Sequence, residues 1–345
     1  MISMRKFWAF LVVALCFAVL PSCDDDDDDD EDTKPSQTGE LTYSLPAYAF
    51  VGEQIELRAS GITYPEADKV TFRWVSTNLL ADTVHGPVCT ITVPDSLGDF
   101  SIILTATAEG YYDKTSIKYL TSVRLGSNGS LTGIPAAADS IQDARDGQWY
   151  NITEAGNLLW FAENLNWEGA GNGYAKADAA GYVLGRLYTW NDATGGVSAS
   201  GLGNGPQGVC PEGWSLPTKE DWEDLGKALG GENIVFENSW KGLGDNVMVN
   251  AKFNGYKFWE YTPECNPENM FGWAAISAGS CTNRYNNYSG LKEYAFWWCS
   301  TEMSAEKAYY RYIFYDRPDF DVNFAGKDNF GASVRCVRLK ETAQE

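Results

Sequence analysis

Histidine is almost absent from this sequence of 345 residues, which contains only His85. The usual serine and cysteine hydrolases need a histidine base, and most catalytic zinc sites need one or more histidine ligands. His85 lies in a turn-rich stretch, where a solvated side chain is the expected state. The scarcity of histidine therefore excludes these enzyme classes, whereas enzymes that use only carboxylates remain compatible with the sequence.

Positive charge is also scarce, with 26 Lys and Arg residues against 47 Asp and Glu residues and a formal net charge of −21. Such a chain repels nucleic acids and anionic membrane surfaces, so neither is an expected partner. Neutral glycans, cations and basic protein patches remain compatible with this charge.

Long apolar runs are missing except at the N-terminus, where Phe7–Leu20 follows Arg5 and Lys6. A basic start before a short apolar run is typical of a signal peptide rather than of a membrane-spanning helix. The run leads into Leu20-Pro21-Ser22-Cys23, which resembles the lipobox of bacterial lipoproteins and predicts lipidation of Cys23. Acyl chains there would anchor the protein with about 0.8 kcal/mol per buried methylene.

An unbroken acidic tract, Asp24–Asp32, follows the predicted anchor. A block of like charge cannot pack and stays extended as a solvated tether. Acidic residues beside a lipidated cysteine also resemble the surface-export signal of Bacteroidota lipoproteins. We therefore expect a lipid-anchored outer-membrane protein that faces the cell exterior, with a periplasm-facing anchor as the alternative.

Short alternating apolar runs separated by turn residues fill the stretch from Leu41 to Leu125. They predict strands at Gln54–Ala59, Val70–Val75, Val88–Val93, Phe100–Ala106 and Thr115–Tyr119. Regular short strands around a central Trp74 indicate a β-sandwich, and the segment resembles the Ig-like or PKD-like modules that precede surface domains. We expect this domain to act as a spacer.

The composition changes after a Gly/Ser/Ala-rich stretch, and eleven of the 13 tryptophans lie between Trp149 and Trp298. Six motifs occur there in order: Asp143–Gly147, Leu159–Leu165, Gly185–Trp190, Val209–Thr218, Trp297–Glu302 and Ser333–Val337. Together they resemble the Fibrobacter succinogenes major paralogous domain. That family is similar in pattern to the C-type-lectin-like and sulfatase-modifying-factor fold, so the resemblance implies an α+β surface module of undetermined activity.

The predicted fold is therefore multi-domain, with an all-β sandwich followed by an α+β domain. In chain order we expect a signal peptide (1–22), a lipidated acidic tether (23–40), an Ig/PKD-like β-sandwich (41–125), a linker (126–136), the C-type-lectin-like family domain (137–340) and a tail (341–345).

Local patterns inside the last domain agree with an α+β fold. Thr218 precedes several acidic residues, which predicts a capped helix N-terminus. Trp222, Leu225 and Leu229 would form the buried face of this helix, and Gly230-Gly231 would end it. Strands are expected at Phe296–Thr301, Ala308–Tyr315 and Ser333–Leu339.

Export from the cell permits disulfides. Cys210 and Cys336 lie in the first and last cysteine-bearing motifs of the family, and the resemblance implies that they pair. Cys265 and Cys281 lie in loop-rich sequence and are expected to form a second bridge, with Cys281–Cys299 as the alternative. Cys89 and Cys299 are otherwise expected to be buried thiols. No Cys-x-x-Cys spacing occurs, so redox or zinc chemistry lacks support.

The best candidate ligand surface is the segment Cys281–Gly290, which is too polar for a core and too irregular for a strand. Tyrosine and tryptophan rings stack on sugars, and nearby polar groups fix their orientation. C-type-lectin-like folds also carry their ligand loop in this region. The candidate residues are Arg284, Tyr285, Asn287 and Tyr288, with contributions from Trp259 and Trp273; an ordinary variable surface loop is the alternative.

A weaker hypothesis is a Ca²⁺ site at Asp316, Asp319 and Asp321, whose carboxylates are the hard ligands that calcium prefers. A solvated acidic loop is the alternative. A carboxylate hydrolase needs two acids across a cleft, and the sequence selects no pair among the candidates Glu163, Asp192, Glu260, Glu264, Glu302 and Asp316. A formylglycine-type oxidase would depend on Cys281 and Cys299.

We therefore expect a non-catalytic surface lipoprotein that binds a glycan or a protein ligand through its C-terminal domain and needs no cofactor other than, at most, Ca²⁺. A structural or adhesion component of the envelope without a small ligand is the second hypothesis. A carboxylate-based hydrolase or a formylglycine-type oxidase is the third.

Overall fold

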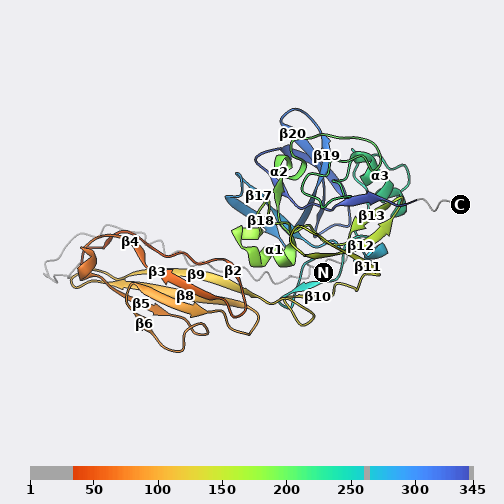
Figure 1. Cartoon of the computed structure of the whole chain (residues 1–345). Helices are drawn as coiled ribbons and strands as arrows, with labels where there is room; N and C mark the ends of the chain where they lie inside the picture. The colour runs from red at the N-terminus through yellow and green to blue at the C-terminus, as the bar shows by residue number, and fades with distance from the viewer. Residues whose placement is uncertain (1–33, 260–264, 342–345) are drawn as a thin grey trace, which may run out of the picture.

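The computed structural model describes residues 34–259 and 265–341. The predicted signal peptide, the lipidated Cys23 and the acidic tract lie outside these residues, as do Glu260 and Glu264. A β-rich N-terminal domain extends sideways from a larger, more rounded C-terminal domain (Figure 1). None of the helices in the described residues is long and apolar enough to cross a membrane.

The N-terminal domain is built from short strands, as the alternating sequence predicts. They are β1 (Thr38–Thr42), β2 (Tyr48–Phe50), β3 (Gln54–Arg58), β4 (Ser60–Tyr64), β5 (Thr71–Val75), β6 (Val84–His85), β7 (Val88–Thr92), β8 (Asp99–Thr107) and β9 (Lys114–Val123). One sheet has the order β2-β9-β8-β5-β6, and the pairs β1–β4 and β3–β7 complete the domain. The sequence missed β1, β2, β4 and β6, which are short or expose most of their residues.

Trp74 occupies the centre of the N-terminal core, as predicted. Its ring is fully buried and meets Tyr43 edge-on at a centroid distance of 5.1 Å. Its indole N–H donates to the carbonyl of Gly86 at 2.9 Å, so the buried polar atom is satisfied. Cys89 is buried in the same core, in agreement with the prediction.

The C-terminal domain is also β-rich and has three short α-helices and two 3-10 helices, Tyr174–Lys176 and Met270–Gly272, among its described residues. Its helices are α1 (Asp178–Leu184), α2 (Trp190–Thr194) and α3 (Lys219–Ala228). Its strands are β10 (Leu131–Thr132), β11 (Asp139–Gln142), β12 (Trp149–Ala155), β13 (Leu158–Phe161), β14 (Tyr188–Thr189), β15 (Lys252–Phe253), β16 (Tyr256–Lys257), β17 (Ala278–Thr282), β18 (Asn287–Leu291), β19 (Tyr294–Glu302), β20 (Lys307–Phe314), β21 (Asp321–Gly326), β22 (Gly331–Ala332) and β23 (Val337–Leu339).

These strands form three sheets. The first has the order β11-β12-β13-β23, the second β14-β22-β17-β19-β20-β21 with β18 beside β17, and the third β10-β15-β16. The predicted strand Ser333–Leu339 is shorter than expected, because only Val337–Leu339 is regular. The residues before Val337 pass from one sheet to another. The backbone N–H of Ser333 donates to the carbonyl of Phe296, and the carbonyl of Cys336 accepts from the backbone N–H of Phe161.

Helix α3 begins and ends as the sequence predicts. The Thr218 hydroxyl accepts from the backbone N–H of Asp221, and the Asp221 carboxylate accepts from the backbone N–H of Thr218, which completes a capping box. Trp222, Leu225 and Leu229 are buried along one face. The helix stops before Gly230, whose φ of 87° suits glycine at a helix end.

Helix α3 packs its buried face onto an aromatic cluster at the centre of the C-terminal domain. Trp222 lies 5.1 Å from Trp160 and 6.2 Å from Trp273, and Trp273 lies 5.0 Å from Trp297, measured between ring centroids. All four rings are fully buried. The high tryptophan content therefore builds a core.

The predicted Cys210–Cys336 disulfide is confirmed, and it joins cysteines 126 residues apart. Both cysteines are fully buried, and the bridge fixes the end of the chain to the loop that precedes α3. Closing so long a loop constrains the unfolded chain strongly.

The second predicted bridge, Cys265–Cys281, is wrong. The Cys281 thiol, on β17, is unbridged and packs against Gly331. Cys265 faces a different part of the fold, where its sulfur lies 3.5 Å from the carbonyl oxygen of Tyr315. The alternative Cys281–Cys299 bridge is not formed either, because Cys299 is a buried thiol beside Thr301.

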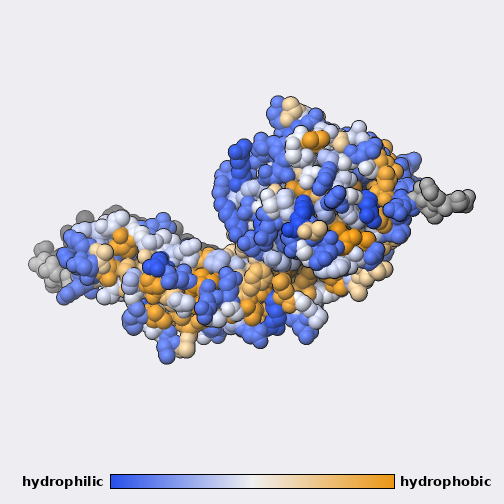
Figure 2. Space-filling view, viewed as in Figure 1, coloured by the Kyte–Doolittle hydropathy of each residue, from blue (hydrophilic) through white to orange (hydrophobic). Residues whose placement is uncertain are grey.

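The segment predicted as a linker, 126–136, is bound to the C-terminal domain rather than free. Its strand β10 pairs with β15, and the Ser130 carbonyl accepts from the backbone N–H of Asn254 at 2.8 Å. The N-terminal domain also contacts its neighbour directly, with Phe50 of β2 packed edge-on against Tyr182 of α1 at 5.5 Å. Hydrophobic atoms run across this junction (Figure 2).

Candidate functional site

The segment Cys281–Gly290, expected to be too irregular for a strand, is largely a hairpin: β17 ends at Thr282, and β18 begins at Asn287 and pairs with it. The turn between the two strands has an unusual backbone. Asn283, Arg284 and Tyr285 all have positive φ values, of 53°, 48° and 65°. The Tyr285 hydroxyl donates to Asp192 and accepts from the backbone N–H of Thr189 at 2.8 Å. Burial and the neighbouring Asp192 raise the pKa of Tyr285 well above its usual range. The Tyr285 hydroxyl therefore already makes two hydrogen bonds within the protein, which stabilise the turn.

The other predicted loop residues divide into two groups. Tyr288 is half-buried and packs on Tyr174 at 5.3 Å, and burial raises its pKa to about 12. Arg284 and Asn287 are exposed, and Arg284 lies 4.0 Å from Asp328. The hairpin thus exposes Arg284 in its turn and Asn287 at the start of β18, and its role in binding stays a prediction.

Trp259 and Trp273 do not belong to an exposed binding surface, and that part of the prediction is wrong. Trp273 is fully buried in the aromatic cluster, and Trp259 is 4% exposed, with its indole N–H donating to the Ala275 carbonyl at 3.0 Å. Both rings were expected to stack on a ligand, but they complete the core instead.

The predicted calcium ligands do not converge. Asp319 accepts from the backbone N–H of Gly242 at 3.1 Å, and Asp321 pairs with Arg317 at 3.0 Å and accepts from Ser239. Within the described residues, no three acidic, cysteine or histidine side chains are grouped so as to hold a metal ion. The Ca²⁺ hypothesis is therefore corrected, because the acids of this loop stabilise its turns.

A groove of about 810 Å³ lies where the two domains meet. It is lined by segments 124–136, 147–151, 162–166 and 181–185, together with Arg335. The first of these segments includes the end of the N-terminal domain and the residues expected to be a linker. The groove is therefore a composite site whose walls come from both sides of the domain junction.

Two exposed aromatic side chains stand at the groove. Trp149 at the start of β12 is 63% exposed, and Tyr182 of α1 is 43% exposed. Every other described tryptophan is more buried than Trp149. Because its exposed indole lies beside a groove, Trp149 is a candidate contact residue.

Hydrogen-bond acceptors lie between these aromatic side chains and the core. Glu163 is half-buried and accepts from the backbone N–H of Asn151 at 2.6 Å. Burial raises the pKa of Glu163, and the nearby Arg335 opposes that rise. Asn166 is 4% exposed and donates to Gln148 at 2.9 Å, but its Oδ1 accepts no hydrogen bond from the described residues.

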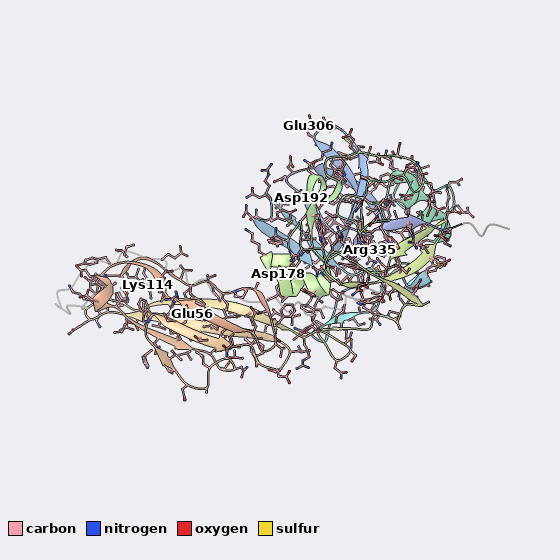
Figure 3. The ribbon with its side chains drawn as sticks, in the orientation of Figure 1. Glu56, Lys114, Asp178, Asp192, Glu306 and Arg335 are labelled. Carbon is pink, nitrogen blue, oxygen red and sulfur yellow. A yellow bond between two sulfur atoms is a disulfide. The ribbon has the colours of Figure 1, made fainter. Side chains whose placement is uncertain are left out.

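Beneath these groups, Arg335 joins two of the six sequence motifs. Its Nε donates to Asn164 Oδ1 at 2.8 Å, and its terminal nitrogens donate to the carbonyls of Phe161, Trp273 and Ala274. Figure 3 shows Arg335 in the interior of the C-terminal domain. Because its guanidinium donates hydrogen bonds to Asn164 and to three backbone carbonyls, Arg335 is a structural residue and has few donors left for an anionic ligand.

The motif at 143–147 is structural as well. Arg145 donates to Asp143 through both Nε and Nη2, and Nη2 also reaches the carbonyl of Val209 at 2.9 Å. The guanidinium stacks on Trp167 at 4.2 Å. Burial alone would raise the pKa of Asp143, but the Arg145 hydrogen bonds hold it below its usual value.

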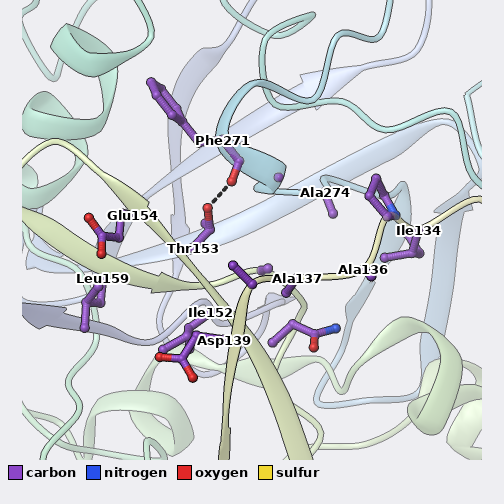
Figure 4. Close-up of a pocket in the computed structure, with 15 residues that line it drawn as sticks. Ile134, Ala136, Ala137, Asp139, Ile152, Thr153, Glu154, Leu159, Phe271 and Ala274 are labelled. Atoms are coloured by element: carbon purple, nitrogen blue, oxygen red, sulfur yellow. Dashed lines mark hydrogen bonds between the residues drawn. The ribbon is translucent and has the colours of Figure 1, made fainter.

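A second, mainly apolar cavity of about 470 Å³, here called the narrow branch, adjoins the groove. Ile134, Pro135, Ala136, Asn151, Ala162 and Ala274 line both cavities, so the two lie side by side along this shared wall. Figure 4 shows the segment Ile134–Ala138, here called the crossing segment, on one side of this branch and Phe271 on the other. Thr153 donates to the Phe271 carbonyl there.

Sequence reasoning identified Glu163 as an acid and placed it in a motif, but it missed Trp149, Tyr182 and Asn166 as site residues. The available signal was the position of Trp149 directly after the 143–147 motif. Its exposure could not be read from the sequence, because neighbouring tryptophans in the same domain are buried.

Comparisons with known proteins identify the family but no activity. No curated protein matches the chain. Among solved structures, the extracellular domains 3–5 of Drosophila OTK match with 12% identity and a TM-score of 0.22, over 37% of this chain and 46% of that one. The Fibrobacter succinogenes major domain matches residues 153–338, more than half of the sequence. The chain therefore belongs to the Fibrobacter succinogenes major domain family.

Proposed function

We propose that this protein is a non-catalytic, surface-displayed lipoprotein that binds a glycan in the groove between its two domains. The observation that carries the proposal is the exposed Trp149 beside a groove of about 810 Å³ whose wall contains Glu163. Small-molecule sites combine such concave surfaces with a few placed polar groups.

The chemistry of the groove suits a sugar better than it suits an anion. An indole face stacks on the apolar face of a sugar ring, while carboxylate and amide oxygens accept hydrogen bonds from hydroxyl groups. Among the described residues, Glu163 is the one acid that lines the wider cavity, and Asp139 and Glu154 line the adjoining one; a carboxylate-based hydrolase needs two acids across a single cleft. The strong negative charge of the whole chain also disfavours acidic ligands and nucleic acids.

The wider proposal keeps the predicted architecture and location. The N-terminal domain would be an Ig/PKD-like sandwich, and the C-terminal domain would have a C-type-lectin-like arrangement. Lipidation of Cys23 and the acidic tether would place both domains outside the outer membrane. Because the N-terminal domain contributes to the groove, it would be part of the binding unit as well as a spacer.

The loop after β17 supports a second candidate, a contact with a protein partner. Arg284 and Asn287 are exposed there on a backbone fixed by Tyr285. Preorganised loops lose little entropy on binding, which favours their use as contact surfaces. The groove is the stronger candidate because it is concave and carries an exposed tryptophan.

Replacing Trp149 with alanine should weaken glycan binding by roughly tenfold or more, because losing an aromatic anchor costs about 2 kcal/mol. The measurement is calorimetric titration of the full chain with neutral oligosaccharides, with and without a calcium chelator. Tyr119→Ala is the matched control, since Tyr119 is 67% exposed on β9 outside the groove. Equal affinities for the two variants, or no binding by the wild type, would contradict the proposal.

A further inference from the structure

The two branches of the groove differ in chemistry. The wider branch contains Glu163 and Trp149, whereas the narrower branch is walled by Ala137, Leu159 and Phe271. Three polar side chains of the narrow branch have partners nearby: Glu154 pairs with Lys340 at 3.0 Å, Asp139 accepts from the backbone N–H of Ser140 at 2.8 Å, and Thr153 donates to the Phe271 carbonyl. The Asn151 side chain also lines this branch. The narrow branch therefore presents mainly apolar surface to a ligand.

The junction of the branches brings an acceptor close to this apolar surface. Asn151 and Ala162 line both branches, and the Asn151 backbone N–H donates to Glu163. A ligand spanning the junction would need a hydrogen-bond donor on one side and an apolar substituent on the other. A sugar with hydroxyl groups alone meets only the first requirement.

We propose that the groove recognises an acetamido sugar, with its amide N–H directed to the Glu163 side and its acetyl methyl in the apolar branch. This inference rests on the proposed function and specifies its ligand class. The amide of an N-acylated sugar supplies the donor, and its acyl group supplies the apolar substituent two bonds away. An amino sugar without the acyl group lacks the part that enters the narrow branch.

The crossing segment forms part of the wall of the narrow branch. Ile134, Pro135 and Ala136 line both branches, and Ala137 lines the narrow one. Ala137 is half-buried, so a larger side chain at this position would extend into the branch. Ala137→Leu should therefore exclude the acetyl group while leaving Trp149 and Glu163 in place.

The test compares three β-1,4-linked tetrasaccharides of equal length, built from glucose, glucosamine or N-acetylglucosamine. Each is titrated into the full chain by calorimetry at neutral pH and physiological salt. We expect the N-acetylglucosamine oligomer to bind at least about fourfold more tightly than the glucose oligomer, the gain expected for one buried methyl group. Ala137→Leu and Phe271→Ala should reduce that preference, with little effect on the affinity for the glucose oligomer.

The possible failures are distinguishable. If all three oligomers bind equally and Trp149→Ala weakens each, the groove is a glycan site and the acetamido inference is wrong. A preference that survives both Ala137→Leu and Phe271→Ala in folded protein would also overturn it, because the acetyl group would then lie elsewhere. If no oligomer binds in a Trp149-dependent way, the proposed function itself fails.

Discussion

Removing the Cys210–Cys336 disulfide should lower the free energy of unfolding of the C-terminal domain by about 4–5 kcal/mol. The bridge joins residues 126 apart, so its loss releases a long closed loop in the unfolded chain. Since both cysteines are fully buried, the double variant Cys210→Ser/Cys336→Ser also places two polar hydroxyls in the core. Both effects act in the same direction.

Denaturant unfolding followed by tryptophan fluorescence measures this loss. Eleven of the 13 tryptophans lie in the C-terminal domain, so the signal reports mainly on that domain. A reductant should destabilise the wild type and leave the double variant unchanged, which provides an internal control. A loss below about 1 kcal/mol would show that the unfolded chain gains little freedom from opening the loop.

Arg335→Met should destabilise the same domain by roughly 3 kcal/mol or more. The substitution leaves the buried carbonyls of Phe161, Trp273 and Ala274 without the donors that Arg335 provides, whereas Asn164 Oδ1 keeps the indole N–H of Trp297 as a donor at 2.9 Å. Burial lowers the pKa of the guanidinium, which shows that the fold holds this cation at a desolvation cost. Relief of that cost offsets part of the loss but not the cost of several buried acceptors without partners.

The matched control for Arg335→Met is Arg338→Met. Arg338 is exposed on β23, where its guanidinium lies 5.0 Å from the Trp214 ring, so its replacement should cost less than about 0.5 kcal/mol. Both variants are compared by denaturant unfolding of the full chain. Similar stabilities for the two variants would contradict the structural role assigned to Arg335.

Local sequence patterns predicted the helices and strands that are determined by residues within one short segment. Helix α3 was predicted by its Thr218 cap, its spaced apolar residues and its terminal glycines, all within one short segment. Strands β19 and β20 were predicted by continuous apolar runs. The Cys210–Cys336 pairing followed from the resemblance to a family, whereas Cys265–Cys281 was expected only because both cysteines lie in loop-rich sequence, which does not imply proximity in space.

The candidate site could not be predicted in the same way, because no single stretch of sequence contains the residues that form it. Its walls come from segments near residues 130, 150, 165 and 183, which are far apart in the sequence and are brought together by the tertiary fold. Exposure separates Trp149 from the buried Trp273, yet both lie in similar sequence surroundings. Asp319 and Asp321, two of the three aspartates proposed for calcium, show the converse, since they are close in sequence but interact with different partners.

The central claim is that ligand binds in the groove rather than at the loop after β17. Hydrogen–deuterium exchange of the full chain, with and without a bound N-acetylglucosamine oligomer, tests it most directly. Within the described residues, the backbone N–H groups of Ile134, Ala136 and Ala137 donate no hydrogen bond, so they should exchange rapidly in the free protein. We predict ligand-induced protection at residues 131–138 and 147–151, with none at 283–288. Protection confined to 283–288 would contradict the account and identify the loop as the binding surface.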